Sequence, residues 1–252
     1  MSKYIHLRIE NQTAFLTLNR PEKHNAFNSA LLKELSNMLD ELNKDKKIRL
    51  LILAGRGKSF SSGVDLDALL SLKSIEEAKE FAYLLEETSE KIYKFSKPVI
   101  ARLHGLALGG AAGFASAADI RIATPGTKIG FPAVKLGAIL PATCTIYVES
   151  LIGRNNLLDL TLTGRIIEAK EASDMGLINE IVSEENIDNR INEWARQILE
   201  GSVEAIKLTK QTVNFPYTVL LEQAKLYAVD NFAYLSQTKA WQERMKNFSS
   251  KK

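Results

Sequence analysis

Short apolar segments alternate with longer helical patterns along the first half of the chain, and this alternation limits the possible folds most. The helical patterns at residues 29–42 and 74–95 each open with a serine suited to an N-cap and repeat apolar residues at three- and four-residue spacing. Strands that alternate with helices predict βαβ crossovers and a largely parallel sheet, hence an α/β fold. The strand-like segments are residues 14–18, 50–54, 98–103 and 119–123.

From about Ser183 onward the pattern is helical only. Its longest piece, residues 219–235, carries more apolar surface than a lone helix could bury, which predicts docking on another subunit. We therefore expect a core of residues 1–182 and a helical oligomerisation region of residues 183–252. The residues expected between subunits are Val219, Leu220, Leu221, Leu226, Tyr227, Phe232 and Leu235.

Composition excludes several classes of protein. The net charge of +3 is too weak to select a partner, and the lysine-rich residues 43–49 favour a solvated helix end over a nucleic-acid patch. One cysteine, Cys144, cannot form an intramolecular disulfide, and no Cys/His cluster has the spacing of a metal site. The N-terminus lacks the apolar core of a secretory signal, and no apolar run is long enough to cross a membrane. We expect a cytoplasmic protein without metal, membrane or nucleic-acid partner.

Two loops rich in small residues follow predicted strands. They are residues 55–69 and residues 104–122, and the second contains the adjacent Gly109 and Gly110. Ligands of parallel sheets bind at the carboxyl ends of strands, and the second loop runs into a helix whose N-terminal dipole favours negative charge. Converging N–H donors without a phosphate-loop lysine favour an oxyanion hole for a thioester or ester carbonyl. The alternative is that the glycines only permit tight strand-to-helix turns.

Five segments, in this order, resemble the motifs of the crotonase, or enoyl-CoA hydratase/isomerase, superfamily. The similarity runs nearly end to end and is far more specific than a single glycine pattern. The segments are LTLNRPEKHNAFN (16–28), GKSFSSGVDLDAL (57–69), HGLALGGAAGFASAADIRIA (104–123), KIGFPAVKLGAILP (128–141) and LTGRIIEAKEASDMGLINEIV (162–182).

This resemblance implies a crotonase-like ββα spiral with a helical C-terminal trimerisation region, assembled as a homotrimer or a dimer of trimers. It also implies an acyl-CoA substrate, with coenzyme A as part of the substrate and no covalently bound cofactor. Matched motif to motif, the oxyanion donors are the backbone N–H groups of Val64 and Gly110. The substrate-binding residues that it implies are Lys23, His24, Ala26, Ser62, Gly63, Leu66, Gly109, Gly113, Ala133, Leu140 and Cys144.

The sequence departs from the family pattern at the catalytic acids. Family hydratases carry glutamates at the positions that match Gly113 and Ala133, and other members place an aspartate or tyrosine at positions that match Leu140 and Pro141. Hydration of a double bond needs a base for the water and an acid for the α-carbon. None of these four residues can supply either, so the usual hydratase mechanism is not expected.

Three residues are weighed as substitutes. Asp65 adjoins an oxyanion donor, although a structural or CoA-side role is the alternative. Glu149 lies on the helical pattern after the pocket segment, where a solvent-facing position is the alternative. Cys144 is a candidate nucleophile, but free buried cysteines usually act as small hydrophobes.

Three functions remain open. The first is an enzyme of the enoyl-CoA hydratase/isomerase type, a lyase or isomerase of fatty acid metabolism, that polarises a thioester in a backbone oxyanion hole. The second is a binding or scaffolding protein that keeps the CoA site without turnover. The third is a decarboxylase or thioesterase-like enzyme, which needs fewer side-chain acids because the oxyanion hole alone stabilises its intermediate.

Overall fold

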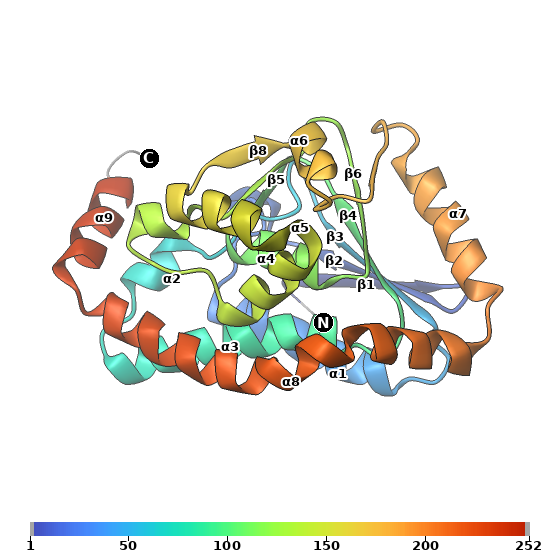
Figure 1. Cartoon of the computed structure of the whole chain (residues 1–252), viewed down its shortest axis with the longest axis horizontal. Coiled ribbons are helices and arrows are strands. Elements are labelled where there is room, and N and C mark those ends of the chain that lie inside the picture. Colours follow the sequence, from blue (N-terminus) through green and yellow to red (C-terminus); the bar gives the residue numbers. More distant parts are fainter. Residues whose placement is uncertain (1–2, 250–252) are drawn as a thin grey trace.

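The computed structural model describes residues 3–249, with side chains to residue 247 (Figure 1). Six strands form the main sheet in the order β1-β2-β3-β4-β6-β9, in which only the first pair is antiparallel. The prediction of a largely parallel sheet is therefore confirmed. These strands are β1 (Ile5–Glu10), β2 (Thr13–Leu18), β3 (Leu50–Gly55), β4 (Val99–Leu103), β6 (Ile120–Ala123) and β9 (Glu180–Ile181).

A second, smaller sheet has the order β5-β7-β8, with β5 parallel to β7 and β7 antiparallel to β8. An isolated bridge between Ser61 and Ala107 of β5 joins the loop after β3 to this sheet. The two sheets therefore meet beside the glycine-rich loops. The strands are β5 (Leu106–Leu108), β7 (Lys128–Gly130) and β8 (Ile166–Glu168).

The helices pack on these sheets, and side chains cap the N-termini of the two helices that the sequence predicted. Ser74 accepts a hydrogen bond from the backbone of Glu77 at 3.1 Å, as predicted, but Asn28 rather than Ser29 caps the earlier helix, by accepting from the Leu31 N–H at 2.9 Å. The α-helices are α1 (Ser29–Lys44), α2 (Leu66–Leu70), α3 (Ile75–Tyr93), α4 (Gly110–Ala117), α5 (Ala142–Thr163), α6 (Ala169–Asp174), α7 (Ile187–Leu199), α8 (Val203–Ser236) and α9 (Lys239–Ser249); η1 (Pro21–Lys23) and η2 (Pro132–Leu136) are 3₁₀ turns.

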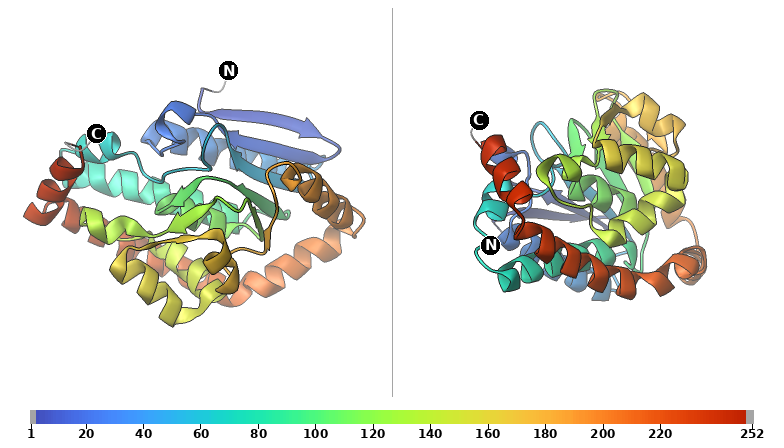
Figure 2. Two further views of the ribbon diagram at one scale, coloured as in Figure 1. Left: turned by 90° about the horizontal axis from the view of Figure 1, so that it is seen from above. Right: turned by 60° about the vertical axis from the view of Figure 1, so that its left-hand side comes forward.

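The faces of the main sheet are covered by different helices because successive strand residues point to opposite sides. Leu51 and Leu53 of β3 belong to the large core that includes α1 and α3, whereas Leu50 and Ile52 pack in a smaller core with Ile191 of α7. In Figure 1, α7 stands beside the strands and α8 runs along α3, an arrangement that Figure 2 shows from two further sides. Within residues 3–249, no helix combines the length and the apolar character that a bilayer crossing requires.

The C-terminal helices contribute to the same large core as the sheet. Leu221 and Phe232 of α8 are 0% and 8% exposed and pack within their own chain, so the prediction that they lie between subunits is wrong for these two. Leu235 is partly buried against the same core. Other residues of α8 are exposed. The division between a core of residues 1–182 and an oligomerisation region of residues 183–252 stays a prediction.

Candidate active site

The two glycine-rich loops lie against each other. The Ser61 N–H donates to the Leu106 carbonyl at 2.9 Å, and the Leu108 N–H donates to the Ser61 carbonyl at 3.2 Å. Gly63 adopts a φ of +88°, and a Cβ there would lie 2.4 Å from the Leu108 carbonyl oxygen and 3.7 Å from the Gly110 nitrogen. Glycine is therefore required at residue 63 both for its backbone conformation and for the close approach of the second loop.

Each loop presents one backbone N–H without a protein acceptor. Among the described residues, no hydrogen bond has the Val64 or the Gly110 N–H as its donor. Gly110 is the first residue of α4, where N–H groups have no partner inside the helix. A Cβ at Gly110 would lie 3.9 Å from Cγ2 of Val64, so the two residues are neighbours. Two free donors at one place suit an oxyanion, because they stabilise negative charge without transferring a proton.

A cavity of about 80 Å³ begins at these donors. Six of the expected site residues line it: Ser62, Val64, Gly109, Gly110, Ala133 and Leu140. Apolar side chains from α2, α3, η2 and α8 complete most of the wall, which suits the hydrocarbon part of an acyl group. The remaining lining residues are Leu69, Ala82, Leu85, Glu86, Pro132, Leu136, Ala138, Ile139, Pro141, Ala228 and Phe232.

Five more of the expected residues lie at or near the loops but outside this lining. The Ser62 N–H donates to the His24 carbonyl at 2.9 Å, which fixes the η1 turn beside the first loop. Lys23 is exposed and its Nζ lies 2.8 Å from Asp67, while Ala26 is buried beneath the turn. Gly63 and Leu66 flank Val64 along the chain. The structure thus brings Lys23, His24 and the 62–66 loop to one side of the site.

Asp65 is engaged in structural contacts. Its carboxylate lies 2.5 Å from Nη1 of Arg20 and accepts the Asp67 N–H at 2.9 Å, which caps α2. The residue is 4% exposed and is not part of the cavity lining. The structure therefore does not bring the Asp65 carboxylate to the reacting end of the site, and its contacts favour the structural alternative.

Cys144 and Gly113 lie behind the cavity wall, where they pack on each other. Cys144 is fully buried, with its Sγ 3.3 Å from Oγ of Ser89, and burial raises the pKa of its thiol to about 12. A thiol with such a pKa is protonated at neutral pH and is a poor nucleophile. Glu149 of α5 is exposed and lies outside the cavity lining. Neither substitute reaches the cavity.

Glu86 is the site residue that the sequence analysis missed. It is 2% exposed, on α3, and it is the one ionisable side chain among the described residues that line the cavity. Its Oε1 accepts the Ala142 N–H at 2.8 Å, and its Oε2 accepts the Thr143 N–H at 3.0 Å and the Thr143 hydroxyl at 2.6 Å. Burial raises the pKa of Glu86, and the hydrogen bonds from Thr143 and Ala142 oppose that rise.

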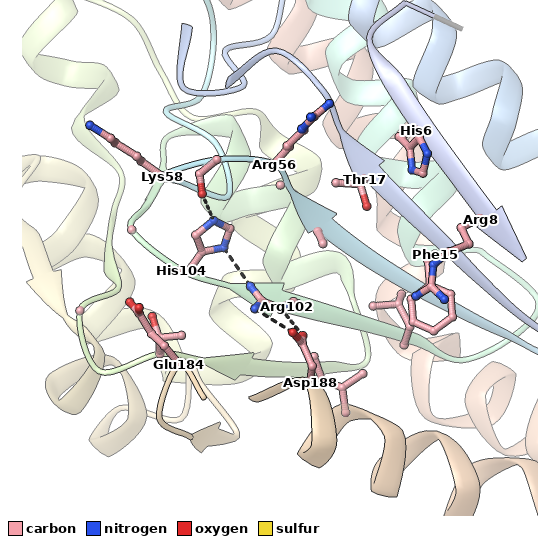
Figure 3. Close-up of a pocket in the computed structure, with 18 of the residues that line it drawn as sticks. His6, Arg8, Phe15, Thr17, Arg56, Lys58, Arg102, His104, Glu184 and Asp188 are labelled. Carbon is pink, nitrogen blue, oxygen red and sulfur yellow. Dashed lines mark hydrogen bonds and ion pairs between the residues drawn. The ribbon is translucent and has the colours of Figure 1, made fainter. Parts of the chain in front are cut away.

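A larger groove of about 940 Å³ lies on the sheet face beside α7 (Figure 3). Two of its charged side chains, Arg102 and Asp188, form an ion pair. Nε of Arg102 donates to Asp188 at 2.6 Å, and Nε2 of His104 donates to the Gly57 carbonyl at 2.9 Å. Burial lowers the pKa of His104, which favours its neutral form. None of the expected site residues lines this groove, and the described residues include no group of three His, Cys, Asp or Glu side chains that could hold a metal.

The chain is similar to known proteins over nearly its whole length. The family model described as enoyl-CoA hydratase/isomerase matches residues 8–252. The chain is 32% identical over 247 residues to the short-chain-enoyl-CoA hydratase of Clostridium acetobutylicum, covering 98% of this chain and 94% of that protein. It is 33% identical to the crotonyl-CoA hydratase of Syntrophomonas wolfei, with coverage of 98% and 95%.

Solved structures give the same result for the fold. The crystal structure of an enoyl-CoA hydratase from Bacillus halodurans superposes with a TM-score of 0.92 at 26% identity, covering 97% of this chain and all of that one. The expected crotonase-like fold with a helical C-terminal region is therefore confirmed. Because the family model spans nearly the whole sequence, the chain belongs to the enoyl-CoA hydratase/isomerase family.

Proposed function

We propose that the protein binds an acyl-CoA and stabilises the enolate of its thioester on the N–H groups of Val64 and Gly110. The observation that carries this proposal is the pair of adjacent, unpartnered donors at the mouth of an apolar cavity. Removal of a proton from Cα, the carbon bonded to the thioester carbonyl, places negative charge on the carbonyl oxygen. Two fixed donors lower the energy of that charge because they need no reorganisation during the reaction.

The η1 side of the site is proposed to hold the CoA moiety. Lys23 and His24 lie on one exposed turn that is tied to the 62–66 loop, whereas the apolar lining lies beyond the donors. The thioester would then bridge a polar outer part and an apolar inner part. Ala26, Gly63 and Leu66 would shape the outer part through backbone and apolar contacts.

Efficient hydration is not part of this proposal. By the motif resemblance, Gly113 and Ala133 match the positions of the two family glutamates, and neither side chain can supply a proton. A CoA-binding protein without turnover, or a decarboxylase or thioesterase-like enzyme, would use the same donors. Enolate formation is favoured over these because the cavity lining includes a buried carboxylate, Glu86.

The test is to delete one donor, the N–H of Gly110. Gly110→Pro removes the N–H at the first position of a helix, where proline is well tolerated. Gly109, at φ 56° and ψ −124°, has the mirror image of the conformation that residues before proline prefer, and glycine adopts both. Gly110→Ala is the matched control, since it keeps the N–H and its Cβ would make only ordinary contacts, the nearest at 3.5 Å.

The readout is the exchange of the α-hydrogens of butyryl-CoA in D₂O, followed by mass spectrometry, with CoA-ester binding measured by calorimetry. Gly110→Pro should bind the ester but exchange it about 10²–10³-fold more slowly. Gly110→Ala should stay within about tenfold of wild type. Equal exchange rates in the proline variant and wild type would contradict the proposal that the Gly110 N–H belongs to an oxyanion hole.

We also propose that the protein assembles as a homotrimer or a dimer of trimers through the exposed face of α8. Apolar residues recur there in series spaced by seven, such as Val213, Leu220, Tyr227 and Tyr234, and each series lies along one side of the helix. Each residue is between 53% and 72% exposed, and exposed apolar side chains gathered on one element are typical of an interface. These residues, the exposed stripe of α8, are Leu208, Val213, Phe215, Val219, Leu220, Leu226, Tyr227 and Tyr234.

A further inference from the structure

We propose that Glu86 is the catalytic base and acid that removes the α-proton of the bound acyl-CoA and returns it. This inference rests on the proposed acyl-CoA function and names the proton carrier of the same site. The first support is position: Glu86 is the one ionisable side chain among the described lining residues, and Leu85, its neighbour, lies against Gly110. A Cβ at Gly110 would be 3.5 Å from Cδ1 of Leu85, so this part of α3 faces the oxyanion donors.

The second support is how the carboxylate is held. The helix α5 begins after Pro141, which offers no side-chain cap, and Glu86 supplies the cap from α3. These contacts fix the side chain, yet they leave Oε1 with a single accepted hydrogen bond. A carboxylate oxygen can accept two, so one lone-pair direction of Oε1 is available for a proton.

The third support is electrostatic. A base at the end of an apolar cavity is poorly hydrated, which strengthens it, and burial accordingly raises the pKa of Glu86. Of the groups facing it from other elements, Lys225 of α8 favours the carboxylate form. Cys144 and Tyr147 of α5 are neutral near pH 7 because burial raises the pKa of each. Glu90, one turn along α3, is ion-paired with Lys225.

In the proposed step the bond between Cα and its hydrogen breaks, the proton moves to Glu86, and the electron pair moves to the thioester oxygen between Val64 and Gly110. With a saturated acyl-CoA the proton, exchanged with solvent, returns to Cα. With a 3-enoyl-CoA it can instead return to Cγ, so that the double bond moves from the Cβ–Cγ to the Cα–Cβ position. One carboxylate suffices for this isomerisation, whereas hydration requires a base and an acid together.

The experiment compares Glu86→Gln with wild type in the exchange of butyryl-CoA in D₂O and in the conversion of 3-butenoyl-CoA to crotonyl-CoA. Both rates should fall by at least about a hundredfold while butyryl-CoA binding persists. Glu90→Gln is the matched control on the same helix, since Glu90 is buried and ion-paired but does not line the cavity. Its rates should stay within about threefold of wild type once the protein is folded.

A second variant separates a catalytic role from capping. Thr143→Val removes the hydroxyl that donates to Oε2 and keeps both backbone donors. Since that hydrogen bond lowers the pKa of Glu86, the rise of the exchange rate with pH should move to higher pH in the variant. An unchanged pH profile would overturn the inference, and this holds even where Glu86→Gln fails to fold.

The outcomes separate the two proposals. If wild type does not bind butyryl-CoA, the proposed function fails and the inference fails with it. If wild type binds the ester but exchanges no α-hydrogen, enolate formation fails and the role of Glu86 fails with it. If Glu86→Gln exchanges as fast as wild type while Gly110→Pro does not, the role of Glu86 alone is overturned. Loss of exchange in Glu86→Gln, with binding retained and Glu90→Gln active, supports it.

Discussion

The thiol of Cys144 occupies the space that a side chain at Gly113 would need. A Cβ on Gly113 would lie 2.2 Å from Sγ of Cys144 and 2.7 Å from its Cβ, well inside van der Waals contact. The two residues pack α4 against α5 behind the cavity. A side chain at residue 113 therefore requires Cys144, or the packing of α4 on α5, to shift.

The first prediction follows from that contact. Gly113→Ala should lower the free energy of unfolding by about 1–3 kcal/mol, because an overpacked core forces side chains and backbone to shift. Cys144→Gly removes both clashing atoms, so the loss should be smaller when Gly113→Ala is made in that background. Urea unfolding of the two single variants and the double variant gives the coupling energy, expected at about 0.5–3 kcal/mol.

Gly126 offers a matched control for the same substitution. A Cβ there would meet nothing within 4 Å, and its φ lies outside the left-handed region. Gly126→Ala should change the free energy of unfolding by no more than about 0.5 kcal/mol. If Gly113→Ala proved as mild as Gly126→Ala, or if the cycle showed no coupling to Cys144, the close packing of α4 on α5 would be contradicted.

The sequence predicted the four central strands of the main sheet but not its edge strands β1 and β9 or the smaller sheet. The long strands β2, β3, β4 and β6 and the helices α1 and α3 carry strong apolar periodicity, and all were predicted within a few residues. The strands β5, β7, β8 and β9 have only two or three residues each, too few to show a pattern. Such short strands form because the folded core aligns them, which single-sequence reasoning cannot see.

The two loops that meet at the candidate site were predicted from their small residues, Gly109 and Gly110 among them. Gly63 was named through the family resemblance, and in the structure a close backbone approach demands glycine there. Glu86 was missed because its partners, Ala142 and Thr143, are more than fifty residues away. One signal was available: a carboxylate four residues after Ala82 lies on the apolar face of the predicted helix, where an unpaired charge is costly.

A second prediction concerns the buried pair of Glu90 and Lys225, whose Oε2 and Nζ are 3.0 Å apart. Burial opposes ionisation of Glu90, but hydrogen bonds from Lys94 and Lys225 outweigh it, so the pKa of Glu90 is lowered. Glu90→Gln should cost about 3 kcal/mol of unfolding free energy at pH 7, because the Lys225 ammonium loses its buried carboxylate partner and keeps the exposed Glu222.

This difference depends on pH in a defined direction. A carboxyl with a lowered pKa stabilises the fold above its unfolded pKa of about 4.3 and loses that effect as pH falls through its folded pKa. The gap between wild type and Glu90→Gln in urea unfolding should therefore shrink below about pH 4. Glu87→Gln, on the same helix with only a 3.5 Å contact to Lys91, should change stability by less than about 0.5 kcal/mol. A gap that stays constant with pH would contradict the pairing.

The third prediction tests the exposed stripe of α8. Val219→Asp with Tyr227→Asp places two charges on residues that are 65% and 72% exposed, so the monomer fold should persist while the assembly is lost. Light scattering at micromolar concentration should show a trimer or hexamer mass for wild type and a monomer mass for the double variant. Ile9→Asp, at a 51% exposed residue of β1, is the control and should keep the wild-type mass. A monomeric wild type would contradict the proposed assembly through the exposed face of α8.

The last prediction concerns hydration. Gly113 and Ala133 supply no proton, and Glu86 is one carboxylate where hydration needs two groups, so crotonyl-CoA hydration should be about 10²–10⁴-fold slower than in a two-acid enzyme. Ala133 lines the cavity, so Ala133→Glu places a second carboxylate in the same space as Glu86 and should raise the rate. Ala133→Gln has the same size without the acid and should not. The loss of enoyl absorbance measures all three, and wild-type turnover at roughly 10 per second or more would show that a second proton carrier already exists.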